Sequence, residues 1–342
     1  MNLEAIDQLL QVNSIYNTPT TSDNQLFKQA MQVCYEWHLA HNPSFANLNL
    51  PLDEPIPVGL FKQINLSTVQ DAPSFSSSGT SGQTTQITID ANTMQRIFAA
   101  QVKMFDYWQV LDQRPANFLI LAPNPQLFKE AGYAYTFTKM TACAPIQEVV
   151  YVCQADLKLD TDLITSTLAK WEKTDSPIYV LGLTVLFEHW VLKQLVASHY
   201  QGHIRMITGG GWKGFTQVLD RSSIVASLKT LFPQAQVQIH DLFGMTEHPL
   251  HYLSCTEQHF HFPLYSRFEV LNPSSEITPE GKVGLIRLQN PFSTSIPCYD
   301  LLTNDLGTWH TGCQCGLPTP YLNLLGRKTT SEDTCAYRAS QT

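Results

Sequence analysis

A run of hydroxyl side chains and glycines at 77–82 is the segment of this chain best suited to chemistry. It reads Ser77, Ser78, Gly79, Thr80, Ser81 and Gly82. The glycines permit positive φ, so that consecutive amides can face one anion, and the hydroxyls add donors for phosphate oxygens. A strand-like alternation over 84–89 and a helical stretch from residue 92 follow. This setting favours a phosphate-binding loop over a flexible Ser/Gly linker, which is the alternative interpretation.

Three consecutive glycines, Gly209, Gly210 and Gly211, come directly after a predicted strand and before Trp212 and Lys213. A lone glycine triplet is usually a tight turn. Because it carries no side chains, it can also form a flat shelf on which a planar base lies. Ligands of parallel sheets gather at the carboxyl ends of the strands, which is where this triplet falls.

Acids and hydroxyls occur in two further places. Thr246 and Glu247 end the run Asp-Leu-Phe-Gly-Met-Thr-Glu beyond another predicted strand. Their hydroxyl and carboxylate suit an α-phosphate and a magnesium ion, since magnesium prefers carboxylates together with phosphate oxygens. Asp305, in the turn-like segment 303–307, can accept hydrogen bonds from both hydroxyls of a ribose. A solvated loop acid at Glu247 and an Asx turn at Asp305 are the alternatives.

Four soft ligands in the last third of the chain suit a tetrahedral structural zinc ion: Cys255, His261, Cys313 and Cys315. A closed site of this kind has no open position for catalysis, so we expect the ion to stabilise the fold of a poorly buried subdomain. His259 or His310 can replace His261 in the set, and an incidental Cys-x-Cys is the alternative.

The composition excludes several classes of protein. A hydrophobic content of 43% and a charged fraction of 15% are typical of soluble globular chains. The formal net charge of −8 argues against nucleic acid or an anionic membrane surface as the main partner. We expect no integral membrane segment and no signal peptide. Eight cysteines without a signal peptide indicate a reducing compartment, which makes the cytoplasm the expected location.

Strand and helix patterns alternate from residue 117 to about 247, which predicts an α/β fold with a parallel sheet covered by helices. The predicted strands are 118–122, 149–153, 178–181, 204–207 and 237–240, and the predicted helices are 163–173, 184–198 and 221–232. Short β-like runs follow. We therefore expect a helical segment over 1–70, with a helix at 26–39, a nucleotide-binding core over 71–250, a small β subdomain over 251–325 and a short tail over 326–342.

The order of these motifs, with Leu-Gly-Arg at 325–327, resembles the adenylate-forming, acyl-activating superfamily from about residue 70 onward. The run 208–213 and the short carboxyl end are similar to the LuxE family of acyl-protein synthetases, with phenylacetate–CoA ligases as cousins. The resemblance implies that the 77–82 loop grips the β- and γ-phosphates of ATP. It also implies that 209–211 line the adenine and acyl site, that Thr246 and Glu247 hold the α-phosphate and Mg²⁺, that Asp305 binds the ribose, and that Arg327 lies at the hinge.

The resemblance further implies an activity. A carboxylic acid, expected to be a fatty acid, attacks the α-phosphorus and gives an acyl-adenylate and pyrophosphate. Cys335, in a Cys-Ala near the carboxyl terminus, then takes the acyl group as a thioester and passes it to an acyl-CoA reductase or an acyl carrier protein. The alternatives are an acyl- or aryl-CoA ligase and a catalytically weak binding subunit; an idle thiol is the alternative for Cys335 itself.

One feature departs from most of the superfamily. The sequence ends fifteen residues after Arg327, so we expect the mobile carboxyl-terminal lid and its catalytic lysine to be absent. Lys213 or Lys328 is then a candidate substitute, unless a partner protein takes part in adenylation. The LuxE family shares this short end, and phenylacetate–CoA ligases share a Cys…His…Cys-x-Cys arrangement, which supports the zinc prediction.

Overall fold

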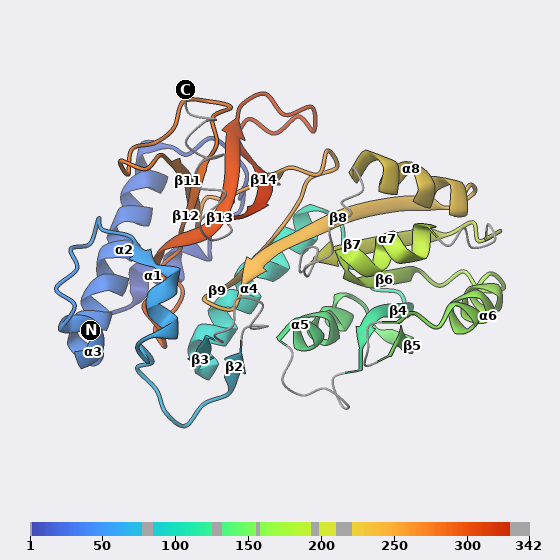
Figure 1. Cartoon of the computed structure of the whole chain (residues 1–342), viewed down its shortest axis with the longest axis horizontal. Helices are drawn as coiled ribbons and strands as arrows, with labels where there is room; N and C mark the ends of the chain where they lie inside the picture. Colours follow the sequence, from blue (N-terminus) through green and yellow to red (C-terminus); the bar gives the residue numbers. More distant parts are fainter. Residues whose placement is uncertain are drawn as a thin grey trace. The chain divides into compact units, whose positions relative to one another are not determined.

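The computed structural model describes residues 2–76, 85–124, 132–154, 158–192, 198–209 and 221–328. The chain divides into two compact units: unit 1 is Met1–Met104 with Gly244–Thr342, and unit 2 is Phe105–Phe243. Figure 1 labels their helices and strands. Unit 1 joins both ends of the chain, whereas the domains predicted from the sequence are consecutive segments; those bounds stay a prediction.

Helices open unit 1: α1 (Glu4–Leu9), α2 (Thr21–His41), α3 (Pro43–Ala46) and the 3-10 helix η1 (Val58–Lys62). The helix predicted over 26–39 is part of α2, which begins earlier because Thr20 caps it. The amide of Asp23 donates to the Thr20 hydroxyl, and the amide of Thr20 donates to the Asp23 carboxylate. The short strands β2 (Ser74–Ser76) and β3 (Gln86–Thr88) pair antiparallel, and α4 (Ala91–Tyr107) follows.

A mainly antiparallel sheet forms the carboxyl-terminal part of unit 1, in the order β10-β14-β13-β12-β11, with β1 paired to β13. Its strands are β1 (Ile56–Pro57), β10 (Phe260–His261), β11 (Arg267–Leu271), β12 (Gly284–Gln289), β13 (Asp300–His310) and β14 (Tyr321–Arg327). Figure 1 shows β13 and β14 lying side by side. Alternating burial along β12 is the pattern of a strand with one face on the core.

The connection between β12 and β13, residues 290–299, is buried throughout. Backbone carbonyls in a buried connection need donors. The Trp37 indole donates to the Thr294 carbonyl at 3.1 Å, and the Thr68 amide donates to the Ser295 carbonyl at 2.7 Å. This connection therefore ties the amino-terminal helical segment to the strand that carries Asp305.

Unit 2 is a parallel sheet in the order β5-β4-β6-β7-β8. The strands are β4 (Ala116–Pro123), β5 (Ile146–Cys153), β6 (Ile178–Leu183), β7 (His203–Gly209) and β8 (Gln236–Met245). Its helices are α5 (Gly132–Met140), the 3-10 helix η2 (Thr141–Cys143), α6 (Thr161–Trp171), α7 (Thr184–Leu192) and α8 (Arg221–Leu231). Every residue of β4 and β6 is buried, as expected for central strands of a parallel sheet.

All five strands predicted for the α/β region are confirmed, and the predicted α/β fold class is confirmed. The strand predicted over 237–240 is longer than its pattern suggested, because β8 continues to Met245 and ends in unit 1. Among the described residues, no helix is long and apolar enough to cross a membrane.

Candidate active site and metal centre

The turn after β8 carries the first pair of predicted site residues. Thr246 and Glu247 form a two-residue turn between β8 and β9 (His248–Leu253). Gly244 precedes the turn, and a Cβ atom there would lie 2.4 Å from Cδ2 of His251. The absence of a side chain at Gly244 therefore lets the His251 ring lie against the end of β8.

Glu247 is a largely buried residue whose carboxylate has no hydrogen-bond partner among the described residues. The residue is 5% exposed. Within the described part of the chain, its side chain has no hydrogen bond or ion pair, although its charge raises the pKa of two neighbours, Asp305 and Cys298. A carboxylate without a protein donor can bind a cation, so this position suits a magnesium ion.

Asp305 and Arg327 are register partners on β13 and β14. The Arg327 Nε donates to Asp305 Oδ1 at 3.2 Å, while Asp305 is only 8% exposed. Burial raises the pKa of the Asp305 carboxyl; Arg327 opposes this shift, and Glu247 adds to it. The Asp305 amide donates to the Thr303 hydroxyl at 3.1 Å, and that hydroxyl donates to the Ile286 carbonyl at 2.8 Å, which fixes the strand locally.

Unit 1 thus brings together three of the predicted site residues, Glu247, Asp305 and Arg327. The two acids are close enough for Glu247 to raise the pKa of Asp305, and the one guanidinium, on Arg327 with a side chain that is 58% exposed, pairs with Asp305. The local charge is therefore negative, and a divalent cation or the hydroxyls of a sugar would satisfy the remaining oxygen lone pairs.

Unit 2 carries the predicted site residue Gly209 at the carboxyl edge of its sheet. Gly209 ends β7, and a Cβ atom there would lie 3.2 Å from the Leu242 carbonyl oxygen. The Thr208 hydroxyl donates to Asp241 Oδ1 at 2.8 Å, and the Leu242 amide donates to the same oxygen at 3.1 Å. Asp241 therefore links the end of β7 to the middle of β8. Sequence reasoning gave it no role, although it directly follows the predicted strand 237–240.

Several predicted site residues lie outside the described residues. These are Ser77, Ser78, Gly79, Thr80, Ser81, Gly82, Gly210, Gly211, Lys213 and Cys335. Their assignments remain predictions.

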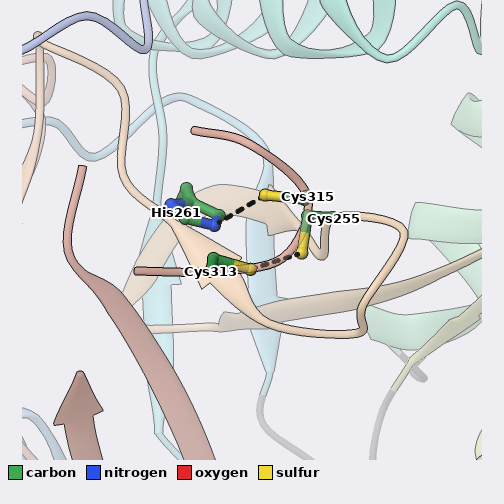
Figure 2. Close-up of side chains that lie close together, drawn as sticks. All are labelled: Cys255, His261, Cys313 and Cys315. Carbon is green, nitrogen blue, oxygen red and sulfur yellow. Dashed lines mark hydrogen bonds between the residues drawn. The ribbon is translucent and has the colours of Figure 1, made fainter. Parts of the chain in front are cut away.

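The predicted metal ligands form one cluster (Figure 2). The ligand atoms of Cys255, His261, Cys313 and Cys315 all lie within 4.8 Å of one another. The Sγ atoms of Cys255 and Cys313 are 3.8 Å apart, and Cys315 Sγ is 3.3 Å from His261 Nε2. Three of the four residues are buried and Cys315 is half-buried, so the cluster is nearly closed to solvent.

Two turns position these ligands. The Cys255 amide donates to the His259 carbonyl at 2.7 Å, which closes the turn between β9 and β10. The Gly316 amide donates to the Cys313 carbonyl at 3.1 Å, and Gly316 has a φ of +86°, which glycine adopts without strain. The sequence pattern Cys-x-Cys-Gly thus encodes a tight knuckle in the loop between β13 and β14.

A hydrogen-bond partner outside the cluster orients the imidazole of His261. Its Nδ1 lies 2.9 Å from the Thr319 hydroxyl, which leaves Nε2 for the cluster. Burial, with a smaller contribution from His259, lowers the pKa of His261 to about 4. Thr319 was missed by sequence reasoning, because nothing in its local pattern distinguishes it from an ordinary loop threonine.

The two alternative histidines differ in position. His259 Nδ1 lies 3.4 Å from Cys313 Sγ and its ring stacks on Tyr321, with the ring centroids 4.2 Å apart. His310 Nε2 lies 3.0 Å from the Thr308 hydroxyl and is not part of the four-residue cluster. The geometry therefore favours His261 as the nitrogen ligand, with His259 beside the cluster.

Comparison with solved structures identifies the fold. The chain is similar to 2-hydroxyisobutyryl-CoA ligase in an open conformation, in complex with 2-HIB-AMP and CoA, with a TM-score of 0.67 and 13% identity over 91% of this chain and 76% of that chain. The same ligase in the postadenylation state, in complex with 2-HIB-AMP, gives a TM-score of 0.65 and 13% identity over 96% of this chain and 74% of that chain. The fold is that of the adenylate-forming ligases.

No curated protein matches the sequence of this chain. Residues 48–342 match the family described as acyl-protein synthetase, LuxE. The chain belongs to this family, which confirms the resemblance seen in its motifs.

Proposed function

We propose that this protein uses ATP to activate a carboxylic acid, most simply a fatty acid, and then transfers the acyl group to a thiol. Membership of the acyl-protein synthetase family supports this reaction class. The single observation that carries the site assignment is the grouping of Glu247, Asp305 and Arg327 in unit 1, where Arg327 pairs with Asp305 and the charge of Glu247 acts on Asp305.

The role of each residue follows from its chemistry. Asp305, buried on β13, would accept hydrogen bonds from the ribose hydroxyls, and Arg327 would hold the Asp305 carboxylate in place. Glu247 and the Thr246 hydroxyl would hold Mg²⁺ and an α-phosphate oxygen. Magnesium supplies charge neutralisation at the phosphates when bound. The loop 77–82 would contact the β- and γ-phosphates, Gly209 with its two following glycines would lie against the adenine, and Lys213 would stabilise the reacting phosphate.

The proposed reaction has two steps. A carboxylate oxygen of the acid attacks the α-phosphorus of ATP, and the bond to the bridging oxygen breaks, so pyrophosphate leaves with the electron pair. The thiolate of Cys335 then attacks the carbonyl carbon, and the bond between that carbon and the phosphate oxygen breaks to release AMP. The resulting acyl thioester would pass to a partner such as an acyl-CoA reductase or an acyl carrier protein, in the cytoplasm.

Incubation with ATP, Mg²⁺ and a radiolabelled fatty acid tests this proposal. We expect exchange of labelled pyrophosphate into ATP, and label on the protein that hydroxylamine removes. Cys335→Ser should keep the exchange but lose the bound label. Soluble acyl-CoA without bound label would instead indicate a CoA ligase, and no exchange with a broad panel of acids would indicate a binding subunit.

We also propose that Cys255, His261, Cys313 and Cys315 hold a structural zinc ion. Zn–S bonds of about 2.3 Å in a tetrahedron place two sulfurs roughly 3.8 Å apart, and the observed separation of Cys255 and Cys313 is 3.8 Å. A disulfide requires about 2.05 Å, so the cluster fits a metal better than a bridge. With four protein ligands, the ion would have no open position for substrate.

A further inference from the structure

Strand β14 carries one residue more than its partner β13 just before β14 ends. Gly307 of β13 pairs with Leu324 of β14. The next residue of β13 toward its start, Leu306, pairs with Gly326 rather than with Leu325. In the described pairing of these two strands, Leu325 therefore has no register partner, and it is 52% exposed. An extra unpaired residue on one strand of an antiparallel pair is a β-bulge.

The bulge decides which residue Arg327 faces. Arg327 lies opposite Asp305, and its Nε donates to Asp305 Oδ1 at 3.2 Å. The shifted register continues beyond this pair, since the Lys328 amide donates to the Asn304 carbonyl at 2.8 Å. In the register that precedes the bulge, Arg327 would instead lie opposite Asn304, which is exposed. Because neighbouring residues of a strand face opposite sides of the sheet, the extra residue moves the guanidinium to the side of Asp305.

Gly326, which follows the extra residue, has a backbone conformation that suits glycine. Its φ is +127°, a value that residues with a side chain rarely adopt. Crowding is not the reason for glycine here, because a Cβ atom at Gly326 would have no atom of the described residues within 4 Å. Glycine with a positive φ is a recurring component of β-bulges. The backbone conformation of the bulge is therefore what requires glycine at this position.

We propose that Gly326 is a positioning residue: its positive φ accommodates Leu325 as the extra residue of the bulge and so holds the Arg327 guanidinium against Asp305. The inference rests on the proposed function, in which Asp305 accepts hydrogen bonds from the ribose hydroxyls of the nucleotide. Because Arg327 Nε engages Oδ1, it fixes the direction in which the Asp305 carboxylate points. Without this contact the carboxylate would rotate, and its hold on the ribose would weaken.

The test measures binding of AMP, which carries the ribose and requires no turnover. Isothermal titration calorimetry gives the dissociation constant for the wild type, Gly326→Ala, Arg327→Gln and the double variant. We expect each single variant to bind AMP about tenfold more weakly, which is the effect of losing one charged hydrogen bond. The double variant should bind AMP no more weakly than Arg327→Gln alone, because both changes remove the same ion pair. The wild type should also prefer AMP to 2′,3′-dideoxy-AMP, and Gly326→Ala should lose most of this preference.

Two further variants separate the register from a general loss of stability. Gly281→Ala is the matched control, because Gly281 also lies in unit 1 with a positive φ, +78°, and belongs to the turn before β12, outside the bulge. It should leave AMP binding unchanged. Deletion of Leu325 removes the extra residue and keeps the arginine opposite Asp305, since the remaining residues then pair one to one. Combined with this deletion, Gly326→Ala should bind AMP as the wild type does.

Unchanged AMP binding in Gly326→Ala, additive losses in the double variant, or no rescue by the deletion would overturn the inference. If Gly326→Ala alone does not fold, the deletion variant with and without the alanine decides: equal AMP affinity supports the inference, and a loss caused by the alanine overturns it. The proposed function fails separately and in the wild type. A wild type that binds AMP no more tightly than 2′,3′-dideoxy-AMP would contradict the ribose role of Asp305, and the inference would fall with it.

Discussion

Removal of the proposed zinc ion from the cysteine–histidine cluster should destabilise unit 1 by a measurable amount. The four ligands join the turn between β9 and β10 to the loop between β13 and β14. An ion present at about a thousand times its dissociation constant contributes about 4 kcal/mol to folding. For a unit of about 200 residues, each kcal/mol shifts the melting temperature by about 2 to 4 °C. Loss of the ion should therefore lower the melting temperature by about 8 to 16 °C.

The assay is thermal unfolding followed by circular dichroism, before and after chelation, with zinc content measured by mass spectrometry. Cys313→Ser should lower the melting temperature without chelator and lose the zinc. Cys153→Ser is the matched control, because Cys153 is a half-buried cysteine at the end of β5, outside the cluster. Complete removal of zinc with a change of less than about 2 °C, or a purified protein that contains no zinc, would refute the reasoning.

Three further predictions concern stability and the reaction. Gly182→Ala should destabilise unit 2 by about 3 kcal/mol in urea unfolding, because the new Cβ would lie 2.4 Å from the Leu121 carbonyl oxygen; Gly59→Ala, with nothing within 4 Å, should be nearly neutral. Burial lowers the pKa of His38 from 6.5 to about 4. On acidification, His38 therefore takes up a proton in the unfolded state before it does so in the folded state, and the free energy of unfolding should fall by about 3 kcal/mol as the pH drops from 6.5 to 4. His38→Gln should make the free energy of unfolding less dependent on pH over this range. Glu247→Gln should lower pyrophosphate exchange at least tenfold or so; unchanged exchange would rule out its metal role.

The α/β strands of unit 2 could be predicted because each is a short apolar run between turn signals, and parallel strands buried on both faces leave that pattern. The bounds of α2 and β8 could be predicted less accurately from the sequence. The capping box at Thr20 extends α2 to residues outside its apolar periodicity, and β8 continues through Asp241 and Gly244, which are poor strand formers.

The grouping of the four cysteine and histidine side chains could be predicted from residue types, since cysteine and histidine at short spacings are few and specific. The supporting contacts could not. Thr319 orients His261 across 58 residues. Contacts between residues so far apart in the sequence depend on how strands pair and where buried connections run. A local sequence pattern does not reveal either. For the same reason, the sequence does not reveal that both ends of the chain belong to unit 1.

The most direct test of the central claim, formation of an acyl-adenylate, is to trace a carboxylate oxygen of the acid into the products. The acid is supplied with both carboxylate oxygens labelled with ¹⁸O, and AMP is analysed by mass spectrometry after one turnover. Attack on the α-phosphorus followed by thiol attack on the carbonyl carbon leaves one labelled oxygen in AMP, which is the predicted result. Label in inorganic phosphate with ADP as the other product, or AMP without label, would contradict the account.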